Sequence, residues 1–167
     1  VDNLQGRVGA GQVRTIAFSI PKNSIAEWKE HLDKYEIDYT EENALGESSI
    51  RFNDFHGLSL ALVESKMEAT NKNILGFHGV ELLSENPAQT YQLLVNEMGL
   101  QLIRVEPEFY LLEMTGHEKH KVLINRNFTQ RGRLGIGTVH HIAWSVPEVN
   151  ELALWKNHFD MAYKVTD

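Results

Sequence analysis

The chain has 167 residues, of which 42% are hydrophobic, so it is long enough for a compact fold with a buried core. Its net charge is −7 and its lysines and arginines form no cluster, which argues against nucleic acid as a partner. The absence of cysteine excludes disulfides, a thiol nucleophile and thiolate metal ligands. Any metal ion would have to be held by His, Asp, Glu or backbone oxygen.

The sequence shows neither a membrane span nor a signal segment. No apolar run approaches the roughly 18–20 residues that a span requires, and no charged-then-apolar stretch opens the chain. We therefore expect a soluble, cytoplasmic protein with no membrane partner. The chain starts with Val1 rather than methionine and ends in "MAYKVTD" after a helix-like stretch, so we also expect it to be a fragment.

One segment of the chain occurs twice. "GRVGAGQVRTIAFSIP" at 6–21 matches "GRLGIGTVHHIAWSVP" at 132–147, and 9 of the 16 positions are identical at an offset of 126. A match of this length indicates one supersecondary unit used more than once. Each glycine run precedes a strand-like stretch, whereas a dinucleotide-binding loop follows a strand. The glycines are therefore predicted to form turns that lead into each unit.

The first unit has the pattern of a strand, a helix and three strands. After the first strand, Ser24 and Glu27 match a capping box, and Ile25, Trp28 and Leu32 recur at helical spacing. Strand-like runs follow at 36–41, 48–54 and 57–64, the last two joined by the turn "DFHG". Residues 1–64 are thus predicted to form one βαβββ module, and the polar stretch 65–73 the linker after it.

The middle of the chain repeats this order. A strand at 75–83 precedes a helix with Asn86 as its cap, Pro87 in its first turn and Gly99 at its end. Three more strands are predicted at 100–106, 108–114 and 120–126. Residues 74–126 therefore form a second module, and residues 127–167 a glycine-rich linker with the truncated start of a further one.

These modules predict an α+β fold. Repeated βαβββ units should form a cupped mixed sheet with helices on its outer face. The helix residues expected to pack onto that outer surface are Trp28, Leu32, Tyr91, Leu94 and Met98.

Side chains alternate across a strand, so the repeated strand has a bulky face and a small face. In the later copy the bulky face carries His140, Ile142, Trp144 and Val146, and the small face carries Val139, His141, Ala143 and Ser145. In the earlier copy Arg14 falls on the bulky face and Thr15 on the small one, which should line a cavity. A strand histidine is more often structural than a ligand. His140 in particular reads as a hydrogen-bonding residue at the core edge, unable to share a metal with His141.

The stretch "GTVHHIAWSVP", the "GRLGIG" before it and the repeated modules resemble the glyoxalase/bleomycin resistance/extradiol dioxygenase superfamily, also called vicinal oxygen chelate. Within it the chain resembles bacterial ring-cleaving dioxygenases, which carry four modules. By that resemblance residues 1–64 correspond to module two, 74–126 to module three, and the end of the chain to the start of module four.

The resemblance implies a divalent metal, usually Fe(II) in ring-cleaving members, held by two histidines and one glutamate. His141 matches a first-strand ligand. Modules two and three carry Thr15 and Gly79 at that position, with His78 one residue early and on the bulky face, and Ala61 replaces a glutamate. The implied metal centre would thus join module four to a module one outside this chain. The chain alone is expected to hold no metal tightly.

Two functions remain open. The chain is a fragment of a metal-dependent, extradiol-type ring-cleaving dioxygenase or related glyoxalase-family enzyme that acts on a catechol- or hydroquinone-like substrate, inactive by itself. Alternatively, it comes from a metal-free, bleomycin-resistance-like protein of the same fold that binds a small molecule. A small aromatic partner suits the enzyme, and a homodimer is compatible with it. Glu81, on the small face near Gly79, is a further ligand, a solvent-facing residue or a salt-bridge residue.

Overall fold

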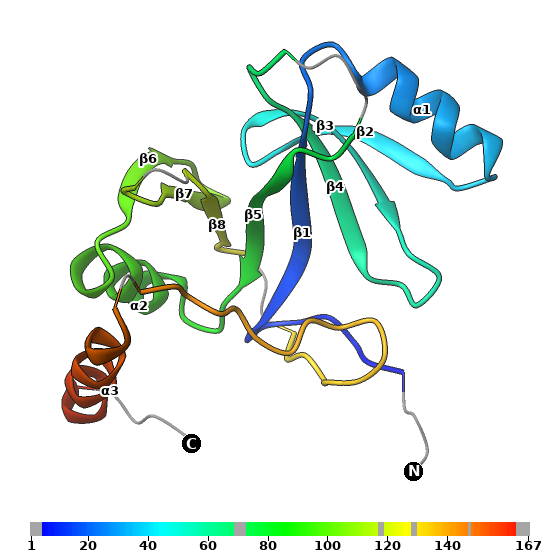
Figure 1. The fold of residues 1–167 in the computed structure, drawn as a ribbon. Helices are drawn as coiled ribbons and strands as arrows, with labels where there is room; N and C mark the ends of the chain where they lie inside the picture. Colours follow the sequence, from blue (N-terminus) through cyan, green and yellow to red (C-terminus); the bar gives the residue numbers. More distant parts are fainter. Residues whose placement is uncertain (1–4, 69–72, 117–118, 128–129, 147, 163–167) are drawn as a thin grey trace.

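The structure is a computed structural model that describes residues 5–68, 73–116, 119–127, 130–146 and 148–162 (Figure 1). The elements in chain order are β1 (Gln12–Ile20), α1 (Ile25–Lys34), β2 (Tyr39–Ala44), β3 (Glu47–Asn53), β4 (Ser59–Glu64), β5 (Gly76–Leu83), α2 (Pro87–Gln92), the π-helical turn η1 (Leu93–Glu97), β6 (Gln101–Val105), β7 (Phe109–Glu113), β8 (Lys121–Asn125) and α3 (Val149–Ala162). Within the described residues, no helix is long and apolar enough to cross a membrane.

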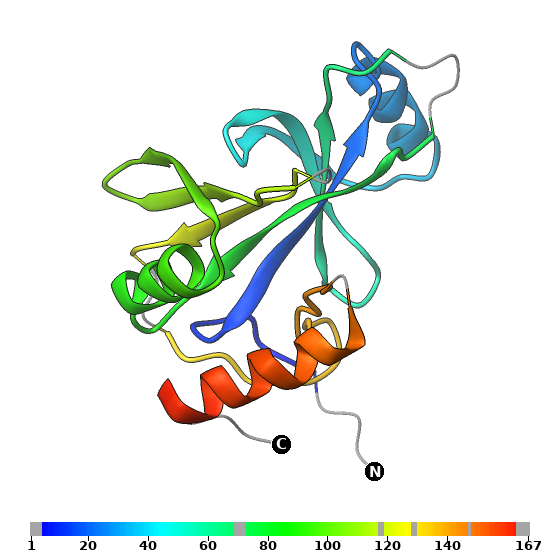
Figure 2. The same ribbon diagram turned by 60° about the vertical axis from the view of Figure 1, so that its left-hand side comes forward.

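The strands form one mixed, eight-stranded sheet in the order β2-β3-β4-β1-β5-β8-β7-β6. The first strand of each module runs parallel to the last strand of the same module, β1 to β4 and β5 to β8. The two first strands, β1 and β5, pair antiparallel at the centre and so join the modules. Figures 1 and 2 show the sheet curling into a cup, which confirms the predicted α+β fold of repeated βαβββ units.

Helices cover the outer side of each module. Trp28 and Leu32 of α1 pack on a cluster that includes Ile20, Ile50 and Leu62. In the second module, the α2–η1 segment packs on Val80, Val122 and Ile124 through Tyr91, Leu94 and Met98. The five helix residues predicted to pack on the sheet therefore do so, because the apolar spacing of each helix matches the outward-facing side chains of the strands beneath it.

The helix ends agree only in part with their sequence signals. Asn86 caps α2 as predicted, accepting a hydrogen bond from Gln89 N at 3.2 Å, and Gly99 follows η1 with φ +75°. Ser24 does not form the predicted capping box, because its hydroxyl donates to the Pro21 carbonyl at 2.6 Å. The carboxylate of Glu64 takes its place and accepts from the first helical amide, Ile25 N, at 3.2 Å.

The inner face of the cup is filled by small and aliphatic side chains. Ala17, Ala61 and Leu111 lie there with Ala44 and Leu45, which belong to the tip of the β2–β3 hairpin. Ala17 therefore lies on the concave face, as the alternation of β1 predicted. The hairpin tip, cyan in Figure 2, bends over the concave face toward the second module.

The segment 139–146 forms no strand, although the repeat predicted one. It makes no ladder within the part of the chain that the structure describes. A β-strand requires a neighbouring strand with which to form backbone hydrogen bonds, and β1 has two such neighbours, β4 and β5. Val139, Ile142 and Trp144 instead pack on the outer cluster beside η1.

Candidate functional site

Two irregularities in the β1–β5 pair direct polar side chains onto the concave face. The register shifts between Val13 and Thr15, which leaves Arg14 as an extra residue, and again opposite the step from Ala17 to Phe18, which leaves His78 as one. A β-bulge turns the extra side chain to the face of its neighbour. The sequence predicted Arg14 and His78 on the bulky face, and for both residues that prediction is wrong.

The first polar cluster surrounds Glu81, which is buried at 8% exposure. Its Oε1 accepts from Arg14 Nη1 at 3.1 Å and from Asn125 Nδ2 at 3.3 Å. Its Oε2 accepts from Arg51 Nη2 at 3.3 Å and from Thr15 Oγ1 at 3.4 Å. All four acceptor positions of the carboxylate are occupied, so the salt-bridge alternative for Glu81 is the one that the structure shows.

The second cluster lies farther along the same face and centres on Glu47. Lys121 Nζ donates to Glu47 Oε2 at 2.6 Å, and His78 Nε2 lies 2.8 Å from the same oxygen. The other ring nitrogen of His78 lies 2.9 Å from Ser19 Oγ. Partial burial alone would raise the pKa of Glu47, but its hydrogen bonds to His78 and Lys121 outweigh burial and lower the pKa to about 2.

The concave face of these two modules does not suit a metal ion. Its buried carboxylate, Glu81, is engaged by two guanidinium groups, and a divalent cation there would be repelled by both. Among the described residues, no three His, Cys, Asp or Glu side chains gather closely enough to hold a metal. Sequence reasoning missed Arg51, Asn125 and Glu47. Only the strand register, which comes from distant pairing, brings them together.

His141 lies outside the cup, in the segment 139–146. It and His140 are both exposed, with their Nδ1 atoms 3.0 Å apart. Both rings line a cavity of about 330 Å³ with Val13 and Leu82, so the predicted separation of the two histidines on opposite faces is wrong here. Without a ladder the backbone does not enforce strict alternation at His140.

From position 141 onward the predicted alternation holds. Ile142, Trp144 and Val146 are half-buried, whereas His141, Ala143 and Ser145 are exposed. The small face of this segment is therefore open to solvent. Among the described residues that line the cavity of His141, there is one further imidazole, that of His140, and there is no carboxylate.

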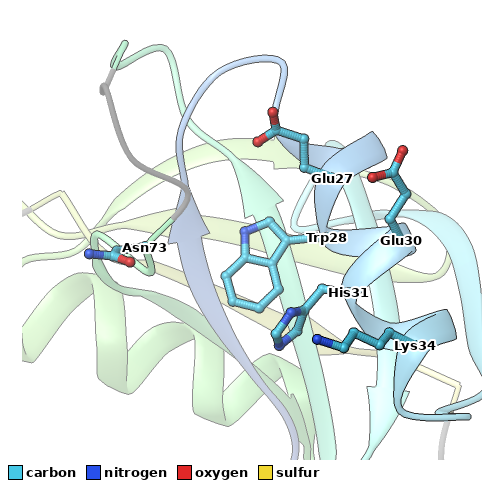
Figure 3. Close-up of a pocket in the computed structure, with 6 residues that line it drawn as sticks. All are labelled: Glu27, Trp28, Glu30, His31, Lys34 and Asn73. Atoms are coloured by element: carbon cyan, nitrogen blue, oxygen red, sulfur yellow. The ribbon is translucent and has the colours of Figure 1, made fainter.

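A groove of about 360 Å³ runs beside α1 (Figure 3). Trp28 and His31 project from the helix side by side, with their ring centroids 5.6 Å apart in an edge-to-face arrangement. The indole Nε1 of Trp28 is buried and finds no hydrogen-bond acceptor among the described residues. The ring is thus held by apolar packing against the cluster of Ile20, Ile50 and Leu62.

No protein-family model matches the chain. The Bacillus subtilis (strain 168) protein named "Putative ring-cleaving dioxygenase MhqO" is 34% identical over 164 residues, which cover 92% of this chain and 53% of that protein. "Putative ring-cleaving dioxygenase MhqE" of the same organism is 32% identical over 161 residues, 90% of this chain and 53% of that protein. The chain thus spans about half the length of these relatives.

Two solved structures are also similar to this chain. The structure described as "putative dioxygenase from Bacillus subtilis subsp. subtilis str. 168" has a TM-score of 0.90 and 32% identity, and the match covers 100% of this chain and 57% of that one. Glyoxalase I from Zea mays has a TM-score of 0.54 at 12% identity over 77% of this chain and 48% of its own, a likeness of fold alone. From its repeated modules, its cupped sheet and these relatives, the chain belongs to the glyoxalase/bleomycin resistance/extradiol dioxygenase superfamily.

Proposed function

We propose that this chain is part of a metal-dependent, ring-cleaving dioxygenase that acts on a catechol- or hydroquinone-like substrate, and that His141 is one of its metal ligands. The observation that carries the proposal is the repeat itself. Arg14 and Thr15 of the first copy are replaced by His140 and His141 in the second, at the position where the superfamily places a histidine ligand. Two relatives that bear a ring-cleaving dioxygenase name support the reaction class.

The surroundings of His141 support a role that faces an open space. Ala143 and Ser145 share its exposed side, and both are small enough to leave room for a planar ring. The described residues do not complete a metal site, so the remaining ligands would have to come from outside this part of the chain. This fits a chain that spans about half the length of its relatives.

A bound divalent metal, Fe(II) in our proposal, would supply the means to lower the pKa of a substrate hydroxyl and to hold substrate and O₂ together. The part of this chain would be to position one imidazole and to offer a small-residue surface beside it. His140 Nδ1, 3.0 Å from His141 Nδ1, would orient that imidazole. A cytoplasmic location and a homodimeric state remain our predictions for the whole protein.

The test uses the full-length protein and a matched pair of neighbouring variants. His141→Ala should abolish ring cleavage and metal content together, while leaving the fold intact, because an exposed side chain contributes little packing. His140→Ala should retain the metal and lose activity by no more than about 10–100-fold, the range for a group that orients a ligand. Metal loss in His140→Ala but not in His141→Ala would reverse our assignment.

A metal-free binding protein is the second candidate. The observation that favours it is the pair of arginines on the concave face, whose positive charges would oppose metal binding at Glu81. If neither histidine variant changes the metal content or the turnover of the full-length protein, the result favours this second function and the dioxygenase proposal fails.

A further inference from the structure

A cavity of about 170 Å³ lies on the concave face, lined by Glu81 and by the β2–β3 hairpin tip. It is distinct from the cavity of His141, which Leu82 lines from the opposite face of β5. An engineered cavity of about 150 Å³ takes up benzene, so this cavity has room for one aromatic ring.

The lining of this cavity combines apolar and polar side chains. Ala17, Leu45, Leu123 and the ring of Phe109 supply apolar surface. Thr15, Glu42, Arg51, Glu81 and Asn125 supply polar groups. A ring with a single polar substituent would therefore bind in one orientation, with the substituent toward Glu42 and Arg51.

The hydrogen bonds of the lining carboxylates indicate that Glu42 is the group that recognises the substituent. Glu81 already accepts from four donors, and its two oxygens have no capacity left. Glu42 accepts from Arg51 Nε at 2.6 Å through Oε1, whereas its Oε2 makes no hydrogen bond within the described part of the chain. Glu42 Oε2 is thus a charged acceptor at the cavity wall, which suits a hydroxyl donor.

The charges around the cavity disfavour an anionic ligand. Three carboxylates line it, those of Glu42, Glu81 and Glu108, so an anion such as a benzoate would be repelled. The one guanidinium group among the lining residues, that of Arg51, is already paired with Glu42 and Glu81. We propose that this cavity is a second, metal-free site that binds a neutral monocyclic arene through a hydroxyl group donated to Glu42.

Phenol is the probe, titrated into the isotope-labelled 167-residue chain and followed by amide chemical shifts. We expect saturable shifts at Ala44, Leu45 and Leu123, and binding of benzoate at least tenfold weaker. Glu42→Gln should weaken phenol binding about tenfold, the cost of a hydrogen bond to a charged group. Glu41→Gln is the matched control and should leave binding unchanged, because Glu41 bonds Lys29 instead, at 2.5 Å.

Two further variants test where phenol binds. Ala17→Val fills the cavity and should abolish phenol binding, with circular dichroism confirming the fold. His141→Ala should leave phenol binding intact, which separates this site from the proposed metal centre. Shifts that fail to saturate, or that map to His140 and disappear in His141→Ala, would overturn the proposal. So would benzoate binding as tightly as phenol.

Discussion

Arg7 and Arg133, which occupy the same position in the two repeats, pair directly with one another. The Arg7 amide donates to the Arg133 carbonyl at 2.9 Å, and the Arg133 amide returns a hydrogen bond to the Arg7 carbonyl at 2.8 Å. A residue that pairs antiparallel with its own repeat equivalent lies on a local two-fold axis. The two glycine runs, predicted as separate turns, therefore form one paired unit.

The flanking bridges obey the same symmetry. Gln5 pairs with Ile136, and Ala10 pairs with Arg131. At the repeat offset of 126, Gln5 is equivalent to Arg131 and Ala10 to Ile136, so each bridge is the image of the other. Gly6 and Gly9 permit the close approach of the two runs, because a Cβ on either would overlap atoms of the opposite run.

We expect Gly9→Ala to destabilise the fold by about 2–3 kcal/mol, the upper part of the usual range for single substitutions. A Cβ at this position would overlap the backbone nitrogen of Gly132 and lie 2.6 Å from its Cα. Gly116→Ala is the control, because a Cβ there would meet open space. Urea unfolding at neutral pH measures both, and equal midpoints would mean that the paired runs can separate without cost.

Glu47 should make the stability of the fold sensitive to acid. Its pKa is lowered from 4.5 to about 2 by its hydrogen bonds to His78 and Lys121, which outweigh partial burial. A group whose pKa is lower in the folded state stabilises it above the unfolded pKa, and this contribution is lost as pH falls through the folded value. Stability should therefore decline between about pH 4.5 and pH 2.

Urea midpoints at pH 7, 4 and 3 test this expectation. Glu47→Gln should lower stability at pH 7 and flatten the decline, since it removes the titrating carboxylate. Glu68→Gln, at a side chain that is 84% exposed, should change neither. An unchanged acid profile in Glu47→Gln would show that other carboxylates control the decline.

The element order could be read from the sequence, whereas the polar clusters could not. Apolar spacing located α1 and the α2–η1 segment, and alternation placed Ala17 on the inner face, because these depend on neighbours along the chain. The inward turn of Arg14 and His78 depends on bulges in the β1–β5 pair, and bulges arise from the register between strands far apart in sequence. For the same reason the strand predicted at 139–146 does not form, since no partner strand lies beside it among the described residues.

Helix α3 should open far more readily than α1. Its apolar side chains Leu152, Leu154 and Met161 are 59%, 67% and 91% exposed. Its contact with η1 includes one ion pair, His158 Nε2 to Glu97 Oε2 at 2.7 Å. Few buried contacts mean a low free energy of local opening, so α3 amides should exchange with solvent much faster than those of α1. Hydrogen exchange by mass spectrometry would show it, and equal protection would mean that α3 is held by more than these contacts.

Two substitutions would transfer the histidine pair to the first repeat. Arg14→His with Thr15→His copies the later sequence onto β1 and brings an imidazole to Glu81, whose Oε2 lies 3.4 Å from Thr15 Oγ1. It removes one guanidinium but leaves Arg51, 3.3 Å from the same oxygen. Because that charge repels a divalent cation, we expect the double variant to bind Zn²⁺ no better than the original chain.

Adding Arg51→Gln to that pair removes the second guanidinium and leaves two imidazoles beside a carboxylate, a donor set that Zn²⁺ accepts. We expect this triple variant to bind Zn²⁺ at least tenfold more tightly than the double variant, measured by calorimetry, with circular dichroism to confirm the fold. Replacing Glu81 by Gln in the triple variant should cancel the gain, since the carboxylate is the anionic ligand. If the double variant, which retains Arg51, already binds one equivalent of Zn²⁺, then the charge of Arg51 is not what disfavours a metal on the concave face.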